Sequence, residues 1–360
     1  MERKRLQYID LARGFAILAI VYSHFTNQVS VVKPDLAVCF GICFLSQFHI
    51  SVFFLVRGQI LAYQEAFLTK EHILKRCKAL LIPYFVFSML NIVYLMIDMR
   101  WEDQTKTIVE VQRNLIYAST LYGISVLWFL PAMLFGEIWF LFVLKRINKK
   151  IIPYFMVILM TVVCSIAPLF SVKEANCIWM SSMQMLVLNY TLVVLLRSFV
   201  ALFYIWVGFY SAGFFKKIYG NKTKIKDYAF LFTGIGSVLF FFSSTVEIHY
   251  MDMGEGWISV LCGLCLSLGL LLLLMLLEEK NMEWLRYPGI CSLWIMCTHK
   301  DFGIPGWCVF FAEMAASLSP RGKNYVFWFT AVAVLFVIEY AICTIIQKSR
   351  TFLFAKKEIQ

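Results

Sequence analysis

Residues 8–25 read YIDLARGFAILAIVYSHF, an apolar run that nevertheless carries Asp10, Arg13 and His24. A helix of about 20 apolar residues crosses a hydrocarbon core of roughly 30 Å. A basic segment, residues 3–5, precedes this run, and no small-residue cleavage site follows it. A secretory signal peptide has such a site, so we expect this run to be a retained first membrane-spanning helix.

The composition extends this prediction to the whole chain. Of the 360 residues, 61% are hydrophobic and 15% are charged, whereas a soluble globular chain has about 25% charged residues. We expect an all-α, polytopic integral membrane bundle of about ten transmembrane helices. The expected spans are residues 9–27, 37–63, 79–97, 119–144, 151–170, 198–215, 228–247, 257–277, 288–312 and 325–347. All connecting segments are short, so residues 1–360 are expected to form a single transmembrane domain with no separate soluble domain.

The basic residues predict the orientation of these helices. With the N-terminus placed in the cytoplasm, 22 of the 33 lysines and arginines fall in cytoplasmic segments, 7 fall outside, and 4 lie in or at the ends of spans. Cytoplasmic loops of membrane proteins carry an excess of Lys and Arg, so we expect both termini to be cytoplasmic. This distribution accounts for the net charge of +11 without a nucleic-acid partner.

The eleven cysteines do not indicate a metal or redox site. Most lie inside expected spans, where a thiol behaves as a small apolar side chain. Cys262 and Cys265 form a CxxC motif in the apolar middle of the eighth span, with no second pair and no neighbouring histidine. A structural zinc site needs four ligands, so no metal is expected.

The ionisable residues of the first span share one face of the helix. Arg13 and His24 are eleven residues apart, which is about three turns or roughly 16 Å along the axis. Asp10 lies one turn before Arg13, at a spacing that allows an ion pair. Such groups cost about 2.5–3.5 kcal/mol in a bilayer and face the bundle interior or a wet cavity. We expect them to line one cavity, with Arg13 at its cytoplasmic mouth; interfacial anchoring by Asp10 and Arg13 is the simpler alternative.

The second span repeats this pattern. Residues 46–60, SQFHISVFFLVRGQI, place His49 near mid-membrane and Arg57 towards the cytoplasm. These two residues are eight positions apart and share a helical face. The second span therefore offers a histidine and an arginine to the same interior as the first.

A basic cluster follows the second span and consists of His72, Lys75, Arg76 and Lys78. Positive charge at the cytoplasmic end of a helix is what the predicted topology requires. Guanidinium groups also bind two phosphate oxygens at once. The basic cluster is therefore a candidate site for the phosphates of an anionic ligand.

Two segments near the expected outer face carry further polar residues. The acidic loop, residues 244–256, contains Glu247 and Asp252, whose carboxylates could hydrogen-bond sugar hydroxyls or simply be solvated in a turn. The ninth span ends with His299 and Lys300, and snorkelling to the interface explains the lysine.

Taken together, these segments resemble the family-3 membrane acyltransferases, bacterial proteins that O-acylate cell-surface glycans. No single segment is specific for that family, but their order along the chain is. The matching segments are YIDLARGFAILAIVYSH (8–24), FHISVFFLVRGQI (48–60), LKRCKALLIPYF (74–85), LWFLPAMLF (127–135), STVEIHYMDMGEG (244–256) and SLWIMCTH (292–299).

The resemblance implies an O-acetyltransferase of the bacterial cytoplasmic membrane. The acyl group, usually acetyl, would come from cytoplasmic acyl-CoA, with acetyl-CoA as the expected donor. The acceptor would be a hydroxyl of a carbohydrate, either a surface polysaccharide or a lipid-linked glycan. A homo-oligomer is compatible with this plan. The residues that the acceptor would meet are His49, Glu247, Asp252 and His299.

The resemblance also implies roles for the ionisable residues. Arg13 and His24 match the arginine and histidine of the first helix that the family needs for activity. The basic cluster matches a motif often written RxxR, but here Lys75 and Lys78 occupy that spacing with Arg76 between them. Arg57 stands where a serine is common and would add a charge for the donor's phosphates.

The expected mechanism follows from these roles. Lys75, Arg76 and Lys78 seat the nucleotide of the donor, and Arg13 and Arg57 guide its thioester end. Histidine accepts a proton near neutral pH, so His24 is expected to be the base towards the acceptor hydroxyl, with Asp10 holding Arg13 in place. A covalent acyl-His24 intermediate is the alternative route.

A transporter is the alternative function. Some relatives of this family, including the membrane part of a bacterial serine racemase, resemble carriers, and a charged cavity would also serve an amino-acid carrier. The basic cluster distinguishes the two functions, because a transferase needs it for donor phosphates and a carrier does not.

Overall fold

The computed structural model describes residues 6–30, 36–64, 69–98, 104–170, 183–244, 246–318 and 323–355. These residues are helical almost throughout and form no β-strand; their one strand-like contact is an isolated bridge between Glu247 and Asp252. The all-α bundle predicted from the composition is confirmed.

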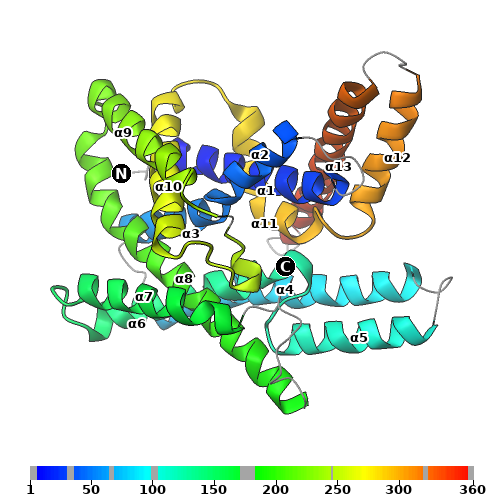
Figure 1. Cartoon of the computed structure of the whole chain (residues 1–360), viewed down its shortest axis with the longest axis horizontal. Helices are drawn as coiled ribbons and strands as arrows, with labels where there is room; N and C mark the ends of the chain where they lie inside the picture. The colour runs from blue at the N-terminus through cyan, green and yellow to red at the C-terminus, as the bar shows by residue number, and fades with distance from the viewer. Residues whose placement is uncertain are drawn as a thin grey trace.

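The helices cross one another at the centre of the molecule and spread outwards from it (Figure 1). In chain order they are α1 (Gln7–Ser30), α2 (Leu36–Ser46), α3 (His49–Tyr63), α4 (Lys70–Asp98), α5 (Gln104–Ser119), η2 (Ser125–Trp128), α6 (Phe129–Arg146), α7 (Ile152–Phe170), α8 (Met183–Ile218), α9 (Lys222–Phe240), η3 (Ile248–Tyr250), α10 (Trp257–Leu277), α11 (Glu283–Thr298), α12 (Ile304–Ser317) and α13 (Lys323–Ala355), where η marks a 3₁₀ helix. The closest pairs are α1 with α11, α3 with α8, α6 with α8, α9 with α10 and α12 with α13.

Eight helical segments within the described ranges are long and apolar enough to cross a membrane. They are Gln7–Asn27, Phe40–Tyr63, Lys70–Ile97, Ser125–Arg146, Ile152–Phe170, Gln184–Ile218, Trp257–Leu277 and Tyr325–Ile346. The segments overlap eight of the ten expected spans. The expected seventh span falls on α9, which begins with Lys222, Lys224 and Lys226, and the ninth falls on two shorter helices. The total of ten spans and the position of the termini stay predictions.

The continuous helix expected at residues 288–312 is not formed. Helix α11 ends at Thr298 and α12 begins at Ile304. Phe302 and Gly303 between them have φ angles of 59° and 72°, in the left-handed region, where a helix cannot continue. The break places His299 on a turn inside the bundle.

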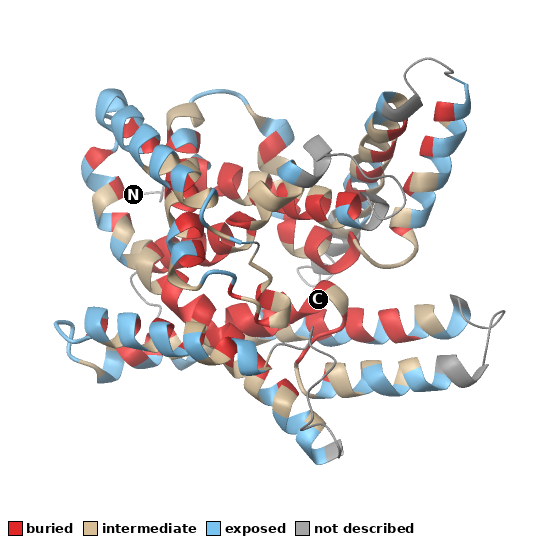
Figure 2. Cartoon of the chain, viewed as in Figure 1, coloured by how far each residue is buried: buried red, intermediate tan, exposed pale blue. Residues whose placement is uncertain are grey.

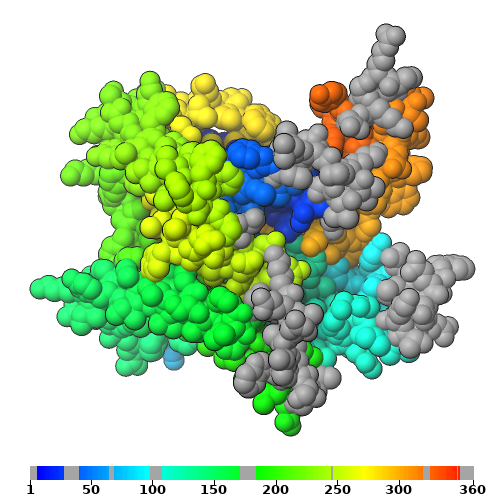
Figure 3. Space-filling view, viewed as in Figure 1, coloured from blue at the N-terminus to red at the C-terminus, as the bar shows by residue number. Residues whose placement is uncertain are grey.

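Burial separates a central group of helices from a peripheral one (Figure 2). In the most apolar windows, 72% of the α1 residues and 78% of the Ser125–Arg146 residues are buried, against 22% in α13. On the face drawn in Figure 3, little of the dark blue surface of α1 is visible. On α1, Asp10 is buried and Arg13 and His24 are half-buried, whereas the exposed apolar face of α13 suits lipid.

Helix α1 packs directly on the backbone of α11. A Cβ atom on Gly14 would overlap the carbonyl oxygen of Leu285, and one on Gly289 would overlap the carbonyl oxygen of Asp10. Small residues allow such close helix approach in membranes. This contact brings the ionisable face of α1 against the middle of α11.

Candidate active site

Three arginines from three helices line one cavity. The cavity has a volume of about 200 Å³ and lies between α1, α3, α4, α6 and α11. Its polar lining consists of Arg13 on α1, Arg57 on α3, Arg76 on α4 and Ser292 on α11, and the rest of its wall is apolar. Guanidinium groups that converge on one apolar-walled space make this cavity a candidate anion site, because charge-assisted hydrogen bonds are stronger where less water competes.

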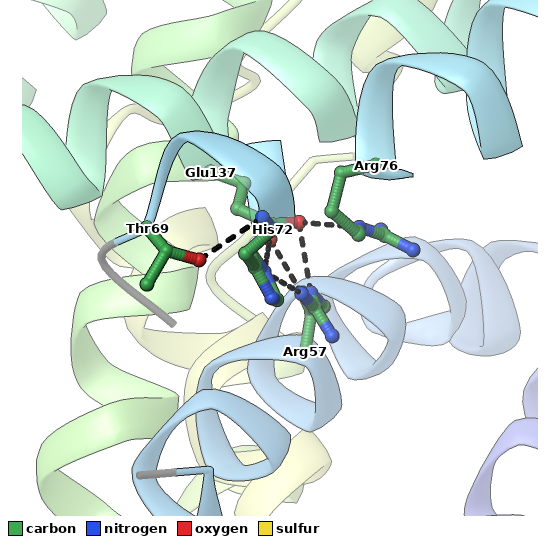
Figure 4. Close-up of polar contacts among 5 residues, drawn as sticks. All are labelled: Arg57, Thr69, His72, Arg76 and Glu137. Carbon is green, nitrogen blue, oxygen red and sulfur yellow. Dashed lines mark hydrogen bonds and ion pairs between the residues drawn. The ribbon is translucent and has the colours of Figure 1, made fainter. Parts of the chain in front are cut away.

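Glu137 on α6 holds the cations at one end of this cavity (Figure 4). Nε of Arg57 donates to Glu137 Oε2 at 2.8 Å, and a second Arg57 nitrogen forms an ion pair with Oε1. Nε of Arg76 donates to Oε2 at 3.0 Å. Nε2 of His72 lies 3.2 Å from Oε1 and 3.3 Å from a terminal nitrogen of Arg57. The carboxylate is 1% exposed, so these partners replace the water that a buried charge needs.

The Glu137 cluster, which we define as Arg57, His72, Arg76 and Glu137, keeps capacity for another anion. Within the described part of the chain, Arg76 uses only Nε for Glu137, and its terminal nitrogens point away from that carboxylate (Figure 4). One carboxylate also faces the positive charges of two arginines. With Arg13 added from across the cavity, positive charge remains in excess.

The two ionisable residues at the start of α1 contact α11. A terminal nitrogen of Arg13 donates to Oγ of Ser292 at 2.9 Å. Asp10 is buried, and its Oδ2 lies 4.0 Å from Nε of Arg286. Arg13 therefore lies in the arginine cavity as expected, while the role of Asp10 in holding it stays a prediction.

The structure divides the basic cluster that the sequence presents as one group. Arg76 lines the cavity, whereas neither Lys75 nor Lys78 is among its lining residues, and both lysines are exposed. Lys75 forms a surface ion pair with Glu71, with its side chain 76% exposed. Arg76 is therefore the member of the basic cluster that can contact a ligand inside the cavity.

His24 lies further along the bundle, beside His299. The two ring centroids are 5.4 Å apart. His24 is half-buried and also interacts electrostatically with His49, His249 and Lys300. The arginine cavity reaches Met296 on α11, three residues before His299. On α1, Arg13 lines this cavity, and His24 lies eleven residues further along the helix.

His49 and His299 each form the same kind of hydrogen bond, and this bond defines the tautomer of each ring. Nδ1 of His49 lies 2.6 Å from the carbonyl oxygen of Leu45, and Nδ1 of His299 lies 2.8 Å from that of Ile295. A carbonyl only accepts hydrogen bonds, so Nδ1 carries the proton and Nε2 of the neutral ring has a lone pair. Both candidate acceptor-binding histidines are buried.

The acidic loop forms a tight turn. The backbones of Glu247 and Asp252 exchange hydrogen bonds of 2.9 and 3.2 Å, and Oδ1 of Asp252 accepts from the Gly254 N–H. The ring of His249 stacks on Trp128 at a centroid distance of 5.7 Å. Burial, with the nearby charges of Arg197 and Lys300, lowers the pKa of His249 well below its ordinary value. Contact of Glu247 and Asp252 with an acceptor stays a prediction.

A buried arginine on α8 ties the acidic loop to the segment before α6. Arg197 is 1% exposed. It donates to the carbonyl oxygens of Tyr122, at 2.6 Å, and of His249. Its guanidinium carbon also lies 4.2 Å from the Tyr122 ring centroid and 5.3 Å from that of Trp128. Within the described ranges no carboxylate forms an ion pair with it.

The sequence prediction missed Glu137 and the partners of Arg197. Glu137 is the single acidic residue within residues 119–144, and an intramembrane acid is itself a signal of a functional or paired group. The partners of Arg197 gave no comparable signal, because they are backbone carbonyls.

One of the comparisons with known proteins gives a match. A family model described as an acyltransferase domain matches residues 6–348 of the chain. No curated protein and no solved structure matches it significantly.

Proposed function

The chain belongs to the family-3 membrane acyltransferases, and we propose that it transfers an acetyl group from acetyl-CoA to a glycan hydroxyl. In this proposal the donor enters at the end of the bundle that the charge distribution predicts to be cytoplasmic. The acceptor is a surface polysaccharide or a lipid-linked glycan at the opposite end. The protein would work as a multi-pass protein of the bacterial cytoplasmic membrane.

The observation that carries the donor assignment is the cavity lined by Arg13, Arg57 and Arg76. Coenzyme A bears a pyrophosphate and a 3′-phosphate, and guanidinium groups bind such oxygens in pairs. Arg57 lies just past the middle of α3 and Arg76 in the first two turns of α4, in the halves of both helices that are predicted to face the cytoplasm. Glu137 holds both side chains in place, so little ordering remains to be done when the donor binds.

The size of the cavity indicates which part of the donor it can hold. Pockets that enclose a whole drug-sized ligand measure about 300–1,000 Å³, so a space of about 200 Å³ holds only part of acetyl-CoA. The narrow pantetheine arm and the adjacent phosphates fit this description. The adenosine portion would then lie at the surface, where Lys75 and Lys78 are exposed.

Acyl transfer also requires a general base, in addition to the arginines that bind the donor. The acceptor oxygen attacks the thioester carbonyl carbon, the new C–O bond forms, and the C–S bond breaks. The hydroxyl proton passes to the base and then to the leaving thiolate of CoA. His24 suits this role because it lies beyond the arginine cavity along α1, and a histidine base accelerates such steps about 10²- to 10⁴-fold.

Binding of radiolabelled acetyl-CoA to the full chain in lipid nanodiscs tests the donor assignment. We expect Arg76→Gln and Arg13→Gln each to weaken binding at least about tenfold, since a hydrogen bond to a charged group contributes about 1.5–3 kcal/mol and about 1.4 kcal/mol is tenfold. Lys222→Gln is the matched control, because Lys222 is an exposed cation paired with Glu279 at 2.6 Å. We expect that variant to bind within about twofold of the wild type, as surface ion pairs contribute little.

The outcome that contradicts the proposal is equally specific. Acetyl-CoA binding that is absent, or that Arg13→Gln and Arg76→Gln leave unchanged, rejects the donor site. Saturable uptake of an amino acid into proteoliposomes without acetyl-CoA would then favour the transporter.

A further inference from the structure

His299 presents one ring nitrogen to the bundle interior with no partner. Its Nδ1–H donates to the Ile295 carbonyl oxygen at 2.8 Å, so Nε2 carries the lone pair. Among the described residues no group hydrogen-bonds to Nε2, and that atom is closed to solvent. His299 as a whole is 2% exposed.

An unsatisfied buried acceptor costs about 1–3 kcal/mol, so such groups generally have a partner. A water molecule is not available here, because it needs open space beside the atom and Nε2 has none. The partner is therefore a donor on a neighbouring side chain.

Three ionisable side chains interact with His299, and they differ in what they can donate. His49 is excluded while neutral, because its Nδ1–H already donates to Leu45 and its Nε2 carries a lone pair. Lys300 is a donor but is the next residue in the chain. His24 approaches across the interface between α1 and α11, and its ring forms no hydrogen bond within the described ranges. Of the three, His24 is therefore the neighbour whose ring N–H is not committed elsewhere in those ranges.

We propose that Nε2 of His299 accepts a hydrogen bond from a ring N–H of His24 and thereby positions His24 as the base. This inference rests on the function proposed above. Which ring nitrogen of a histidine carries the proton is set by the hydrogen bond that the other nitrogen makes. With one nitrogen of His24 donating to His299, its other nitrogen keeps the lone pair that the acceptor hydroxyl needs. The hydroxyl proton goes to that nitrogen and leaves with the CoA thiol, while His299 gains and loses none.

Two substitutions at His299 separate positioning from packing. In His299→Gln the longer side chain can place an acceptor where Nε2 was. His299→Asn keeps a donor near the Nδ1 position, which preserves the bond to Ile295, but it has no atom at the Nε2 position. We expect Asn to lower kcat about 10- to 100-fold, within the range of general-base catalysis, with KM for acetyl-CoA within about twofold. We expect kcat of His299→Gln to be at least about tenfold higher than that of His299→Asn.

Nitrogen NMR of ¹⁵N-histidine-labelled protein in nanodiscs provides a measurement independent of turnover. We expect His24 in the wild type to show a single neutral tautomer and His299→Asn to show an averaged mixture. Thr298→Val is the matched control, because it removes the neighbouring hydrogen bond to Glu339, at 3.0 Å, and leaves the ring of His299 in place. We expect its His24 spectrum and its kcat to stay close to the wild type.

Three results would overturn the proposal. The first is a His24 tautomer that His299→Asn does not change. The second is loss of that tautomer in Lys300→Met, which would assign Lys300 as the donor to Nε2. The third is an equal fall in kcat for Gln, Asn and the Thr298→Val control, which indicates a packing role. If the wild type transfers no acetyl group, the proposed function fails, and a tautomer that still depends on His299 then supports the hydrogen bond without the catalytic role.

Discussion

Glu137 and Arg197 are both buried charges in a membrane bundle, but their surroundings differ in kind. Glu137 is surrounded by long, charged side chains, two arginines and a histidine, at the edge of a cavity. Arg197 is surrounded by backbone carbonyls and aromatic rings, and it is not among the residues that line that cavity.

The difference separates a candidate binding site from a structural clamp. The partners of Glu137 keep unused donors and an excess of positive charge beside open space. The partners of Arg197 are two carbonyl oxygens that accept hydrogen bonds from its two terminal nitrogens. They belong to the segments before α6 and before α10, and Arg197 holds these segments together. A buried charge in a membrane protein marks function when its partners retain hydrogen-bonding capacity towards a cavity, a sharper criterion than burial alone.

The largest effect is expected when Glu137 is removed. Glu137→Leu leaves Arg57 and Arg76 beside each other without a counter-ion, and breaking a buried pair in this way costs about 3–5 kcal/mol. We expect the free energy of unfolding, measured by SDS titration in mixed micelles, to fall by that order. Glu137→Gln, which keeps the shape and one acceptor, should lose less.

Glu137→Gln also tests whether Glu137 belongs to a binding site, unlike Arg197. Acetyl-CoA binding should weaken in Glu137→Gln, because Arg57 and Arg76 lose the group that orients them. Tighter binding instead would show that Glu137 competes with the donor's phosphates rather than orienting the arginines.

A smaller effect is expected at Arg197. Arg197→Met fills a similar volume but leaves the carbonyl oxygens of Tyr122 and His249 without their donor. An unsatisfied buried acceptor costs about 1–3 kcal/mol, so we expect a loss of about 2–4 kcal/mol in the same SDS titration. Affinity for acetyl-CoA should stay within about twofold in the folded fraction. A stable Arg197→Met protein with weakened donor binding would contradict the clamp.

The sequence predicted the members of the site better than their pairing. Helical spacing placed Arg13 and His24 on one face of α1, and the pattern of the second span identified Arg57. Their partners come from other helices: Glu137 is 80 residues from Arg57 in the chain. Local periodicity reports which face of a helix is polar, but it does not report which face of another helix lies opposite.

The same limit explains the error in the fold. The apolar run at residues 288–312 satisfies the length of a span, but its middle reads HKDFG, residues 299–303. Charged residues next to a glycine are compatible with a break, and Phe302 and Gly303 adopt the left-handed φ angles that end the helix there. Composition therefore predicted the span and missed the turn that carries His299.

The pH dependence of stability gives the smallest expected effect, and His249 is the group beside Arg197 that contributes to it. The pKa of His249 is lowered well below 6.5 by burial and by the charge of Arg197, so the ring is neutral in the folded protein at pH 7. The unfolded chain takes up a proton at His249 near pH 6.5. The free energy of unfolding should therefore fall as the pH drops below 6.5, by at most about 1.4 kcal/mol for each pH unit.

His249→Phe keeps the ring that stacks on Trp128 and the carbonyl that Arg197 binds, and it removes the titration. Unfolding titrations at pH 7.5 and 5.5 should show a smaller pH effect in His249→Phe than in the wild type. An identical pH effect in both proteins would show that His249 is protonated in the folded state, and Arg197 would then have to share its pocket with a second cation.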